Sequence, residues 1–284
     1  MESAQIVIAL ARAVYYVAII VMFGAAVFPF YVGHRASVGM PRWLTPVLAV
    51  TALLALIAWL VAFTASLDGL GELMPTLGVV LLESSFGTVW LVRLMAAFMI
   101  VLATFAQLPR SVIAASAAVL LICEGWSGHA VAWGTLGSVN FALHSLCAAF
   151  WLGGLLPLFQ LMRSAHRGDF DLQDTETALR RFSAVATVAV AGVVATGVIN
   201  TWHMLARAPS FADLYVRVLT FKIVLVIVMI GMAGLNRYQI LPRLRTVNRA
   251  VSLHWLVRSV AAEQLIGLLV LIDVSVLGTM NPHA

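Results

Sequence analysis

Eight long apolar stretches, separated by short polar segments, dominate this chain. They cover residues 6–32, 43–67, 86–107, 112–132, 139–162, 182–205, 214–238 and 255–280. Each is close to the ~20 residues that a helix needs to cross a hydrocarbon core of ~30 Å. Because backbone polar groups in lipid must find partners within their own segment, the pattern predicts an all-α, polytopic integral membrane protein with eight transmembrane helices. The first stretch has no basic segment before it, so we interpret it as a retained span rather than a cleaved signal.

Arginine residues lie mainly in the segments that follow the first, third, fifth and seventh stretches. These are Arg35, Arg42, Arg110, Arg163, Arg167, Arg180, Arg181, Arg237, Arg243, Arg245, Arg249 and Arg258. The opposite segments hold Asp68, Glu72, Glu83 and Asp213 but only Arg207 and Arg217. Since cytoplasmic loops of membrane proteins carry the excess of Lys and Arg, the Arg-rich loops are predicted to be cytoplasmic, with both termini outside.

The composition agrees with a lipid environment. Hydrophobic residues make up 62% of the chain and charged residues 10%, against roughly 25% charged residues in soluble domains. The net charge of +5 comes from loop arginines, so topology explains it without a nucleic-acid partner. Cys123 and Cys147 lie in apolar stretches, which argues against a disulfide framework. No Walker motif, dinucleotide fingerprint or nucleophile elbow is present, and we therefore expect no enzymatic activity.

The chain is predicted to form a single integral membrane domain, residues 1–284. The longest cytoplasmic loop, from Arg163 to Arg181, is only a short polar connector. A weak internal repeat pairs Phe86 and Arg93 with Tyr215 and Lys222 at the same aromatic-to-cation spacing. Four spans in each half would keep both halves in one orientation, so the repeat indicates a parallel 4+4 duplication with halves 1–135 and 136–284.

Two histidines and a cysteine fall near the outer side of the fourth and fifth stretches. His129 ends the fourth stretch, and His144 lies early in the fifth with Cys147 three residues later on the same helical face. Glu124 comes five residues before His129. Imidazole and thiolate together suit copper, so this group predicts a metal site of His129, His144, Cys147 and Glu124. The alternative is that an intramembrane histidine serves only as a hydrogen bond between helices.

The other ionisable groups inside the stretches also require a reason, because each costs at least ~2.5 kcal/mol in hydrocarbon. Glu263 and Asp273 lie on one helix, about 15 Å apart along its axis. We expect them to mark the two ends of a polar path. The alternative is that Asp273 forms a buried ion pair with Lys222. Arg12, Arg93 and Lys222 make the outer half positive. That charge suits haem propionates, so a haem b protein with His129 and His144 as axial ligands is the alternative hypothesis.

Glycine-rich segments in the later stretches predict close helix contacts. Gly153 with Gly154, and Gly192 with Thr196 and Gly197, provide small surfaces on which neighbouring helices can approach. We interpret them as packing faces rather than phosphate-binding loops.

Taken together, the sequence resembles the CopD/PcoD copper-resistance family of bacterial inner-membrane proteins, over most of its length. The segments that carry the resemblance are Ser85-Phe86-Gly87 with Trp90 and Arg93, Ser127-Gly128-His129-Ala130, Leu143-His144 with Trp151-Leu152-Gly153-Gly154, Arg181-Phe182-Ser183, Thr196-Gly197 with Asn200 and Trp202, Lys222, Asn236-Arg237, and Glu263. His129 and His144 fall on family motif positions, whereas Cys147 rests on local reasoning alone.

The resemblance implies a multi-pass protein of the bacterial inner membrane that moves copper from the periplasm toward the cytoplasm, often beside a periplasmic copper-binding partner of the CopC type. The chain carries no CopC-like β-domain, so that partner is expected to be a separate protein. A membrane scaffold or copper sensor without transport is a third hypothesis. Because only neutral imidazole binds a metal, acidification toward about pH 5 should weaken copper binding.

Overall fold

The computed structural model describes residues 3–33, 40–41, 43–127, 131, 133–205, 210–244 and 249–280. Within these ranges the chain is helical and has no strand. The helices are α1 (Ser3–Val32), α2 (Leu44–Asp68), α3 (Leu73–Leu82), α4 (Ser85–Phe105), α5 (Arg110–Cys123), α6 (Gly134–His166), α7 (Leu172–Met204), α8 (Leu214–Leu235), α9 (Leu241–Arg243) and α10 (Arg249–Leu277). The all-α prediction is therefore confirmed.

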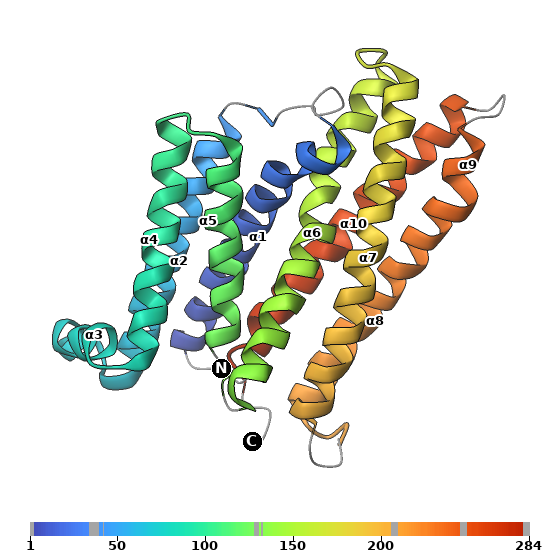
Figure 1. Cartoon of the computed structure of the whole chain (residues 1–284). Coiled ribbons are helices and arrows are strands. Elements are labelled where there is room, and N and C mark those ends of the chain that lie inside the picture. Colours follow the sequence, from blue (N-terminus) through green and yellow to red (C-terminus); the bar gives the residue numbers. More distant parts are fainter. Residues whose placement is uncertain are drawn as a thin grey trace.

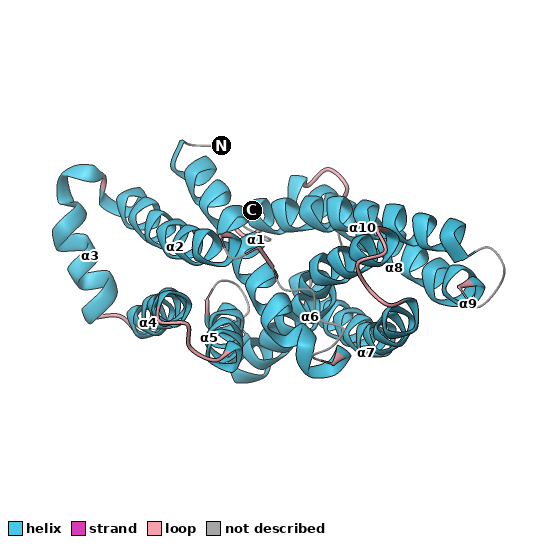
Figure 2. Ribbon diagram, turned by 90° about the horizontal axis from the view of Figure 1, so that it is seen from above, coloured by secondary structure: helices cyan, strands magenta, loops and turns pink. Residues whose placement is uncertain are grey.

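The long helices form two adjacent groups. Helices α2, α4 and α5 lie on one side, and α7, α8 and α10 lie on the other, with α1 and α6 between them (Figures 1 and 2). Helix α1 packs against α2 and α5 on one side, against α10 on the other, and against its neighbour α6. The predicted duplication of two halves stays a prediction, because this grouping does not by itself establish an internal symmetry.

The contact between α1 and α6 depends on glycine. A side chain on Gly24 would collide with the backbone of Gly153, and a side chain on Gly153 would collide with the backbone carbonyl of Ile20. Around this contact α1 is the most buried helix, with Tyr15, Ile19 and Phe28 fully enclosed. Close backbone approach at small residues is a common way for helices to associate in lipid, so the packing role predicted for Gly153 is confirmed.

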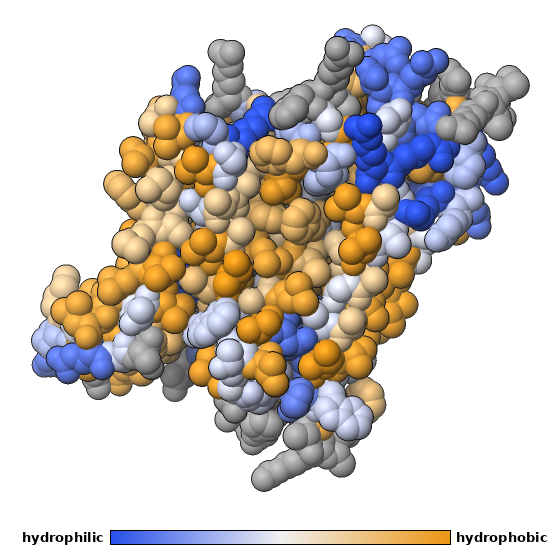
Figure 3. Space-filling view, viewed as in Figure 1, coloured by the Kyte–Doolittle hydropathy of each residue, from blue (hydrophilic) through white to orange (hydrophobic). Residues whose placement is uncertain are grey.

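The outer surface of the bundle is apolar. Large hydrophobic side chains such as Leu54, Phe98 and Ile227 are about 60% exposed (60%, 59% and 61%). Figure 3 shows hydrophobic residues covering the middle of the molecule, with hydrophilic residues gathered toward its ends. A soluble monomer rarely exposes so large an apolar surface. Among the described residues, seven helices (α1, α2, α4, α6, α7, α8 and α10) are long and apolar enough to cross a membrane.

Charge separates the two ends of the bundle. One end, at the top of Figure 1, carries Arg110, Arg163, Arg167, Arg180, Arg181, Arg237 and Arg243, and we call it the Arg-rich end. The other carries Asp68, Glu72, Glu83 and Asp213, and we call it the acidic end. Helix α1 begins and α10 finishes at the acidic end (Figure 1). The predicted orientation, with the Arg-rich end in the cytoplasm, stays a prediction.

Several boundaries differ from those predicted. Helix α5, at the place of the fourth predicted span, has 14 residues and is extended by a 3-10 turn, Glu124–Trp126; it is shorter than a typical span, and the count of eight stays a prediction. Helix α7 begins ten residues before the apolar stretch because Asp171 caps its first turn, accepting hydrogen bonds from the backbone of Gln173 and Asp174. The short helix α3 was not predicted.

Candidate functional site

A cavity of about 1010 Å³ lies in the acidic-end half of the bundle. We call it the large cavity. Helices α6, α7, α8 and α10 provide most of its wall, and α1 and the turn after α5 complete it. Most of its lining is apolar, and its polar or ionisable side chains are Tyr16, Glu124, His144, Ser145, Asn200, Thr201, Trp202, His203 and Lys222. The predicted ligands His144 and Glu124 therefore line the same space.

His144 is held by helix α7. Its Nδ1 lies 2.9 Å from Oγ1 of Thr196, and the Thr196 hydroxyl donates its proton to the carbonyl of Gly192. Since a hydroxyl has one proton to give, Thr196 must accept from His144, which places the imidazole proton on Nδ1. Nε2 is then the nitrogen with a free lone pair. A ring fixed through one nitrogen is the usual arrangement of a histidine that binds a metal through the other.

Glycines on α7 make room for both candidate ligands of α6. A Cβ atom on Gly197 would lie in ordinary contact with the His144 ring, at 3.4 Å, whereas one on Gly192 would collide with Sγ of Cys147, at 2.6 Å. Cys147 is a free, partly buried thiol. The prediction that these two side chains share a helical face is therefore confirmed, as is the packing role predicted for Gly192 and Gly197.

Glu124 is part of a buried network of charges. Its carboxylate lies 2.7 Å from a guanidinium nitrogen of Arg93, and both side chains are almost fully enclosed, at 4% and 0% exposure. The Tyr16 hydroxyl donates to its second oxygen at 2.7 Å, and Arg93 also donates to Ser127 at 2.7 Å. Each oxygen of this carboxylate therefore already has one partner within the protein.

Aromatic rings complete the network. The Trp59 ring lies between two guanidinium groups, with Arg12 at 4.7 Å and Arg93 at 5.0 Å from its centroid. Arg12 also donates to the Tyr16 hydroxyl at 3.0 Å. Cation–π contacts gain strength when the cation is removed from water. They explain how two arginines are accommodated beside the single carboxylate of Glu124.

Lys222 and Asp273 form no direct ion pair, although they lie on the adjacent helices α8 and α10. Lys222 lines the large cavity, and each acts electrostatically on the other. Asp273 is 7% exposed, and one of its oxygens is buried without a hydrogen-bond partner. Asp273 therefore keeps an oxygen that is not satisfied by the protein.

His129, the second predicted imidazole, lies outside the described residues, so its pairing with His144 stays a prediction. Within the described ranges no group of three or more His, Cys, Asp or Glu side chains could hold a metal ion. His203 lines the large cavity and stacks on Trp133 with ring centroids 4.8 Å apart.

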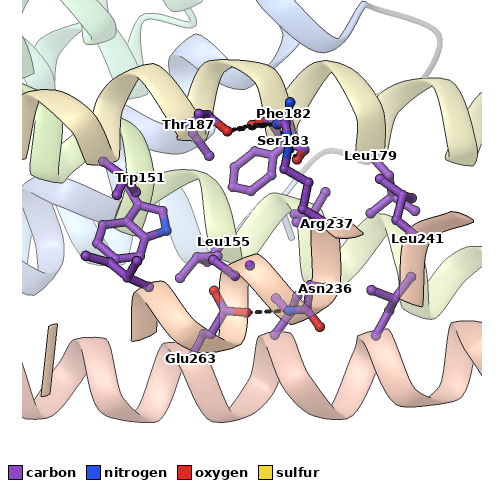
Figure 4. Close-up of a pocket in the computed structure, with 18 of the residues that line it drawn as sticks. Trp151, Leu155, Leu179, Phe182, Ser183, Thr187, Asn236, Arg237, Leu241 and Glu263 are labelled. Atoms are coloured by element: carbon purple, nitrogen blue, oxygen red, sulfur yellow. Dashed lines mark hydrogen bonds between the residues drawn. The ribbon is translucent and has the colours of Figure 1, made fainter. Parts of the chain in front are cut away.

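A second cavity, of about 180 Å³, lies in the half of the bundle near the Arg-rich end. We call it the small cavity. Glu263 of α10 lines it and accepts a hydrogen bond of 2.6 Å from Asn236, as Figure 4 shows. Arg237 is turned toward α7, where it donates to Ser183 and Thr187. The partner of Glu263 is thus an amide rather than a cation.

Comparison with known proteins agrees with this membrane architecture. Residues 1–138 match the model of the copper resistance protein D-like N-terminal domain, and residues 176–277 match that of copper resistance protein D. The inner membrane protein YebZ of Escherichia coli (strain K12) is 32% identical over 240 residues, which cover 78% of this chain and 81% of YebZ. The chain belongs to the copper resistance protein D (CopD) family.

A second relative, copper resistance protein D of Pseudomonas syringae pv. tomato, is 27% identical over 294 residues, with 94% of each chain covered. No solved structure matches the chain. Membership in the CopD family and the apolar helices make this a multi-pass inner-membrane protein. The resemblance, the membrane class and the location predicted from the sequence are confirmed, and the CopD family is not known as a family of enzymes.

Sequence reasoning missed several residues around these cavities. Tyr16 and Trp59 were not singled out, although Tyr16 lies four residues after Arg12, a spacing that places both on one helix face. Thr196 was assigned only to helix packing, yet it holds His144. Asn236 was noted within a family motif but not as the partner of Glu263.

Proposed function

We propose that this CopD-family protein carries copper across the inner membrane, from the acidic end in the periplasm toward the Arg-rich end in the cytoplasm. The copper ion is the cargo, and the large cavity receives it. His144 binds it through Nε2, and His129 provides the second imidazole. Cys147 or Glu124 completes the set of ligands.

The observation that carries this proposal is the setting of His144. The ring faces a large cavity near the acidic end, and its Nδ1 is occupied by Thr196. An orphan imidazole in lipid would be expensive, and intramembrane ionisable groups are usually functional. Cys147 lies on the same helix face, and imidazole with thiolate favours copper over hard cations.

The distribution of charge between the two ends of the bundle supports this direction of transport. Arg-rich loops remain in the cytoplasm, so the large cavity would face the periplasm. An acidic surface there attracts cations. A separate CopC-like protein would be the periplasmic donor.

The test compares two histidines of one helix. His144→Ala should abolish tight copper binding by the purified protein and copper uptake into proteoliposomes. His166→Ala, at the Arg-rich end of α6, is the matched control and should change neither. Copper affinity is measured by competition with a chelator. Unchanged affinity in His144→Ala would refute the proposal, whereas binding without uptake would favour a sensor or scaffold.

The size of the large cavity favours a second candidate, a haem b protein. About 1010 Å³ of mostly apolar space is far more than an ion needs and lies in the range of organic ligand pockets. His144 and His129 would be the axial ligands, and Arg12 or Arg93 would bind a propionate. A Soret band that disappears in His144→Ala would support haem, and bound copper without this band would support transport.

A further inference from the structure

The two cavities lie one after the other along the bundle. The large cavity reaches Trp202 and His203 at the acidic end of α7, and the small cavity reaches Arg237 and Leu241 beyond the Arg-rich end of α8. Trp151 of α6 and Ile230 of α8 line both. Trp151 is only 3% exposed. An apolar layer formed by Trp151 and Ile230 therefore separates the two cavities along the length of the bundle.

The small cavity holds oxygen atoms that lack partners. Glu263 is 2% exposed, and only one of its oxygens accepts a hydrogen bond from Asn236. Its other oxygen points away from Asn236 in Figure 4. Oδ1 of Asn236 is buried without a partner. The second oxygen of Glu263 is therefore the one that could bind a cation, whereas Oδ1 of Asn236 points to the opposite side of their hydrogen bond.

The local backbone explains why Asn236 reaches Glu263. A π-helical turn, Asn236–Ile240, continues α8 toward the Arg-rich end. Such turns widen the helix and occur frequently at functional sites. The neighbouring Arg237 is directed to α7 by three hydrogen bonds. This leaves the carboxylate of Glu263 available beside a space of about 180 Å³, enough for several waters or a partly hydrated ion.

We infer that Glu263, held by Asn236, forms a second, weaker copper site in the small cavity, and that Trp151 with Ile230 is the closed partition between this site and the large cavity. The inference rests on the proposed function, whose cargo it shares. Oxygen ligands bind copper less tightly than imidazole and thiolate do. A transport path whose last site has oxygen ligands therefore favours release of copper, because binding at that site must be weak enough for the ion to leave.

The partition is tested without copper. Ala148 lines the large cavity and Ala186 the small cavity, so Ala148→Cys and Ala186→Cys form a matched pair. Their reaction with a membrane-impermeant thiol reagent is measured in oriented vesicles, against the protein with only its two native cysteines. Ala148→Cys should react only from the acidic end and Ala186→Cys only from the Arg-rich end.

Adding Trp151→Ala should let the reagent reach each cysteine from both ends. Ile230→Ala repeats this measurement if Trp151→Ala does not fold. The partition is overturned if both cysteines already react from one end, or if both truncations leave the sidedness unchanged.

The weak site is tested by equilibrium binding of Cu²⁺ to purified protein. His144→Ala should retain one weak site, which should be lost in His144→Ala/Glu263→Gln. His144→Ala/Asp169→Asn, changed at an exposed carboxylate, is the control and should keep it. Equal binding by the two double variants would overturn the inference. Wild-type protein that binds copper no more tightly than His144→Ala would instead overturn the proposed function, and the comparison of double variants would still decide the role of Glu263.

Discussion

The ion pair between Arg93 and Glu124 gives a direct test of what Glu124 does. The change is Glu124→Gln, which keeps the size of the side chain and removes its charge. Arg93 is 0% exposed and contacts the rings of Trp59 and Trp90, at 5.0 and 5.3 Å from their centroids. The substitution therefore leaves a guanidinium buried without a carboxylate.

The expected loss of stability follows from this burial. Removing one partner of a buried ion pair destabilises a protein by about 3–5 kcal/mol. The amide oxygen of Gln can still accept a hydrogen bond from Arg93 or Tyr16, and such a bond retains about 1 kcal/mol. We therefore expect Glu124→Gln to lower the free energy of unfolding by about 2–4 kcal/mol.

The assay is equilibrium unfolding of the detergent-solubilised protein in SDS, followed by tryptophan fluorescence. Asp169→Asn removes a carboxylate from an exposed ion pair with Arg167 and serves as the control with no expected change. Arg93→Met and the double variant Arg93→Met/Glu124→Gln complete a double-mutant cycle. The double variant should lose about 1–3 kcal/mol less stability than the sum of the losses in the two single variants. Additive losses, or a Glu124→Gln protein as stable as the wild type, would refute this account of the pair.

The same variant separates two roles for Glu124. If Glu124 serves only as the partner of Arg93, Glu124→Gln destabilises the fold but leaves copper affinity unchanged. If Glu124 is also a copper ligand, the same substitution weakens copper binding as well. Chelator competition on folded protein distinguishes the two results.

Two further predictions concern the α6 contacts. Thr196→Val removes the acceptor for His144 and should weaken copper binding by about 10–100-fold in chelator competition, whereas Ser145→Ala in the same cavity should not. Gly153→Ala should lower the free energy of unfolding by about 1–3 kcal/mol or more because the α1 backbone occupies the space, while Gly231→Ala, which meets no neighbour, should be tolerated in the same SDS titration.

Much of the fold was predictable because lipid constrains sequence strongly. An apolar stretch of sufficient length has few alternatives to a helix, and glycine pairs such as Gly153 with Gly154 indicated close packing. Helix ends were less predictable. Helix α7 starts at a polar capping residue, Asp171, and α4 stops where Gln107 adopts a left-handed backbone with φ of 55°; neither depends on hydrophobicity.

The candidate site was predictable only in part, because partners distant in sequence are not encoded locally. The intramembrane position of His144 was enough to single it out, and its spacing from Cys147 placed both on one face. The pairing of Arg93 with Glu124 joins different helices, and so does that of Asn236 with Glu263. The sequence predicted that these charges needed partners, but only the packing of the helices identifies which partner each one has.

Buried polar atoms without hydrogen-bond partners occur in both groups of helices, but the two groups differ in whether a buried cation has a direct carboxylate partner. Around α4 and α5, the charge of Arg93 is met by Glu124, Ser127 and two tryptophan rings. Around α8 and α10, Lys222 faces a cavity without a direct ion pair, and Asp273 keeps an unpartnered oxygen. A cation in lipid without a direct carboxylate partner is costly, and such a residue is a candidate for a functional role. Substitutions in the first group should therefore act mainly on stability, and those in the second mainly on copper binding and movement.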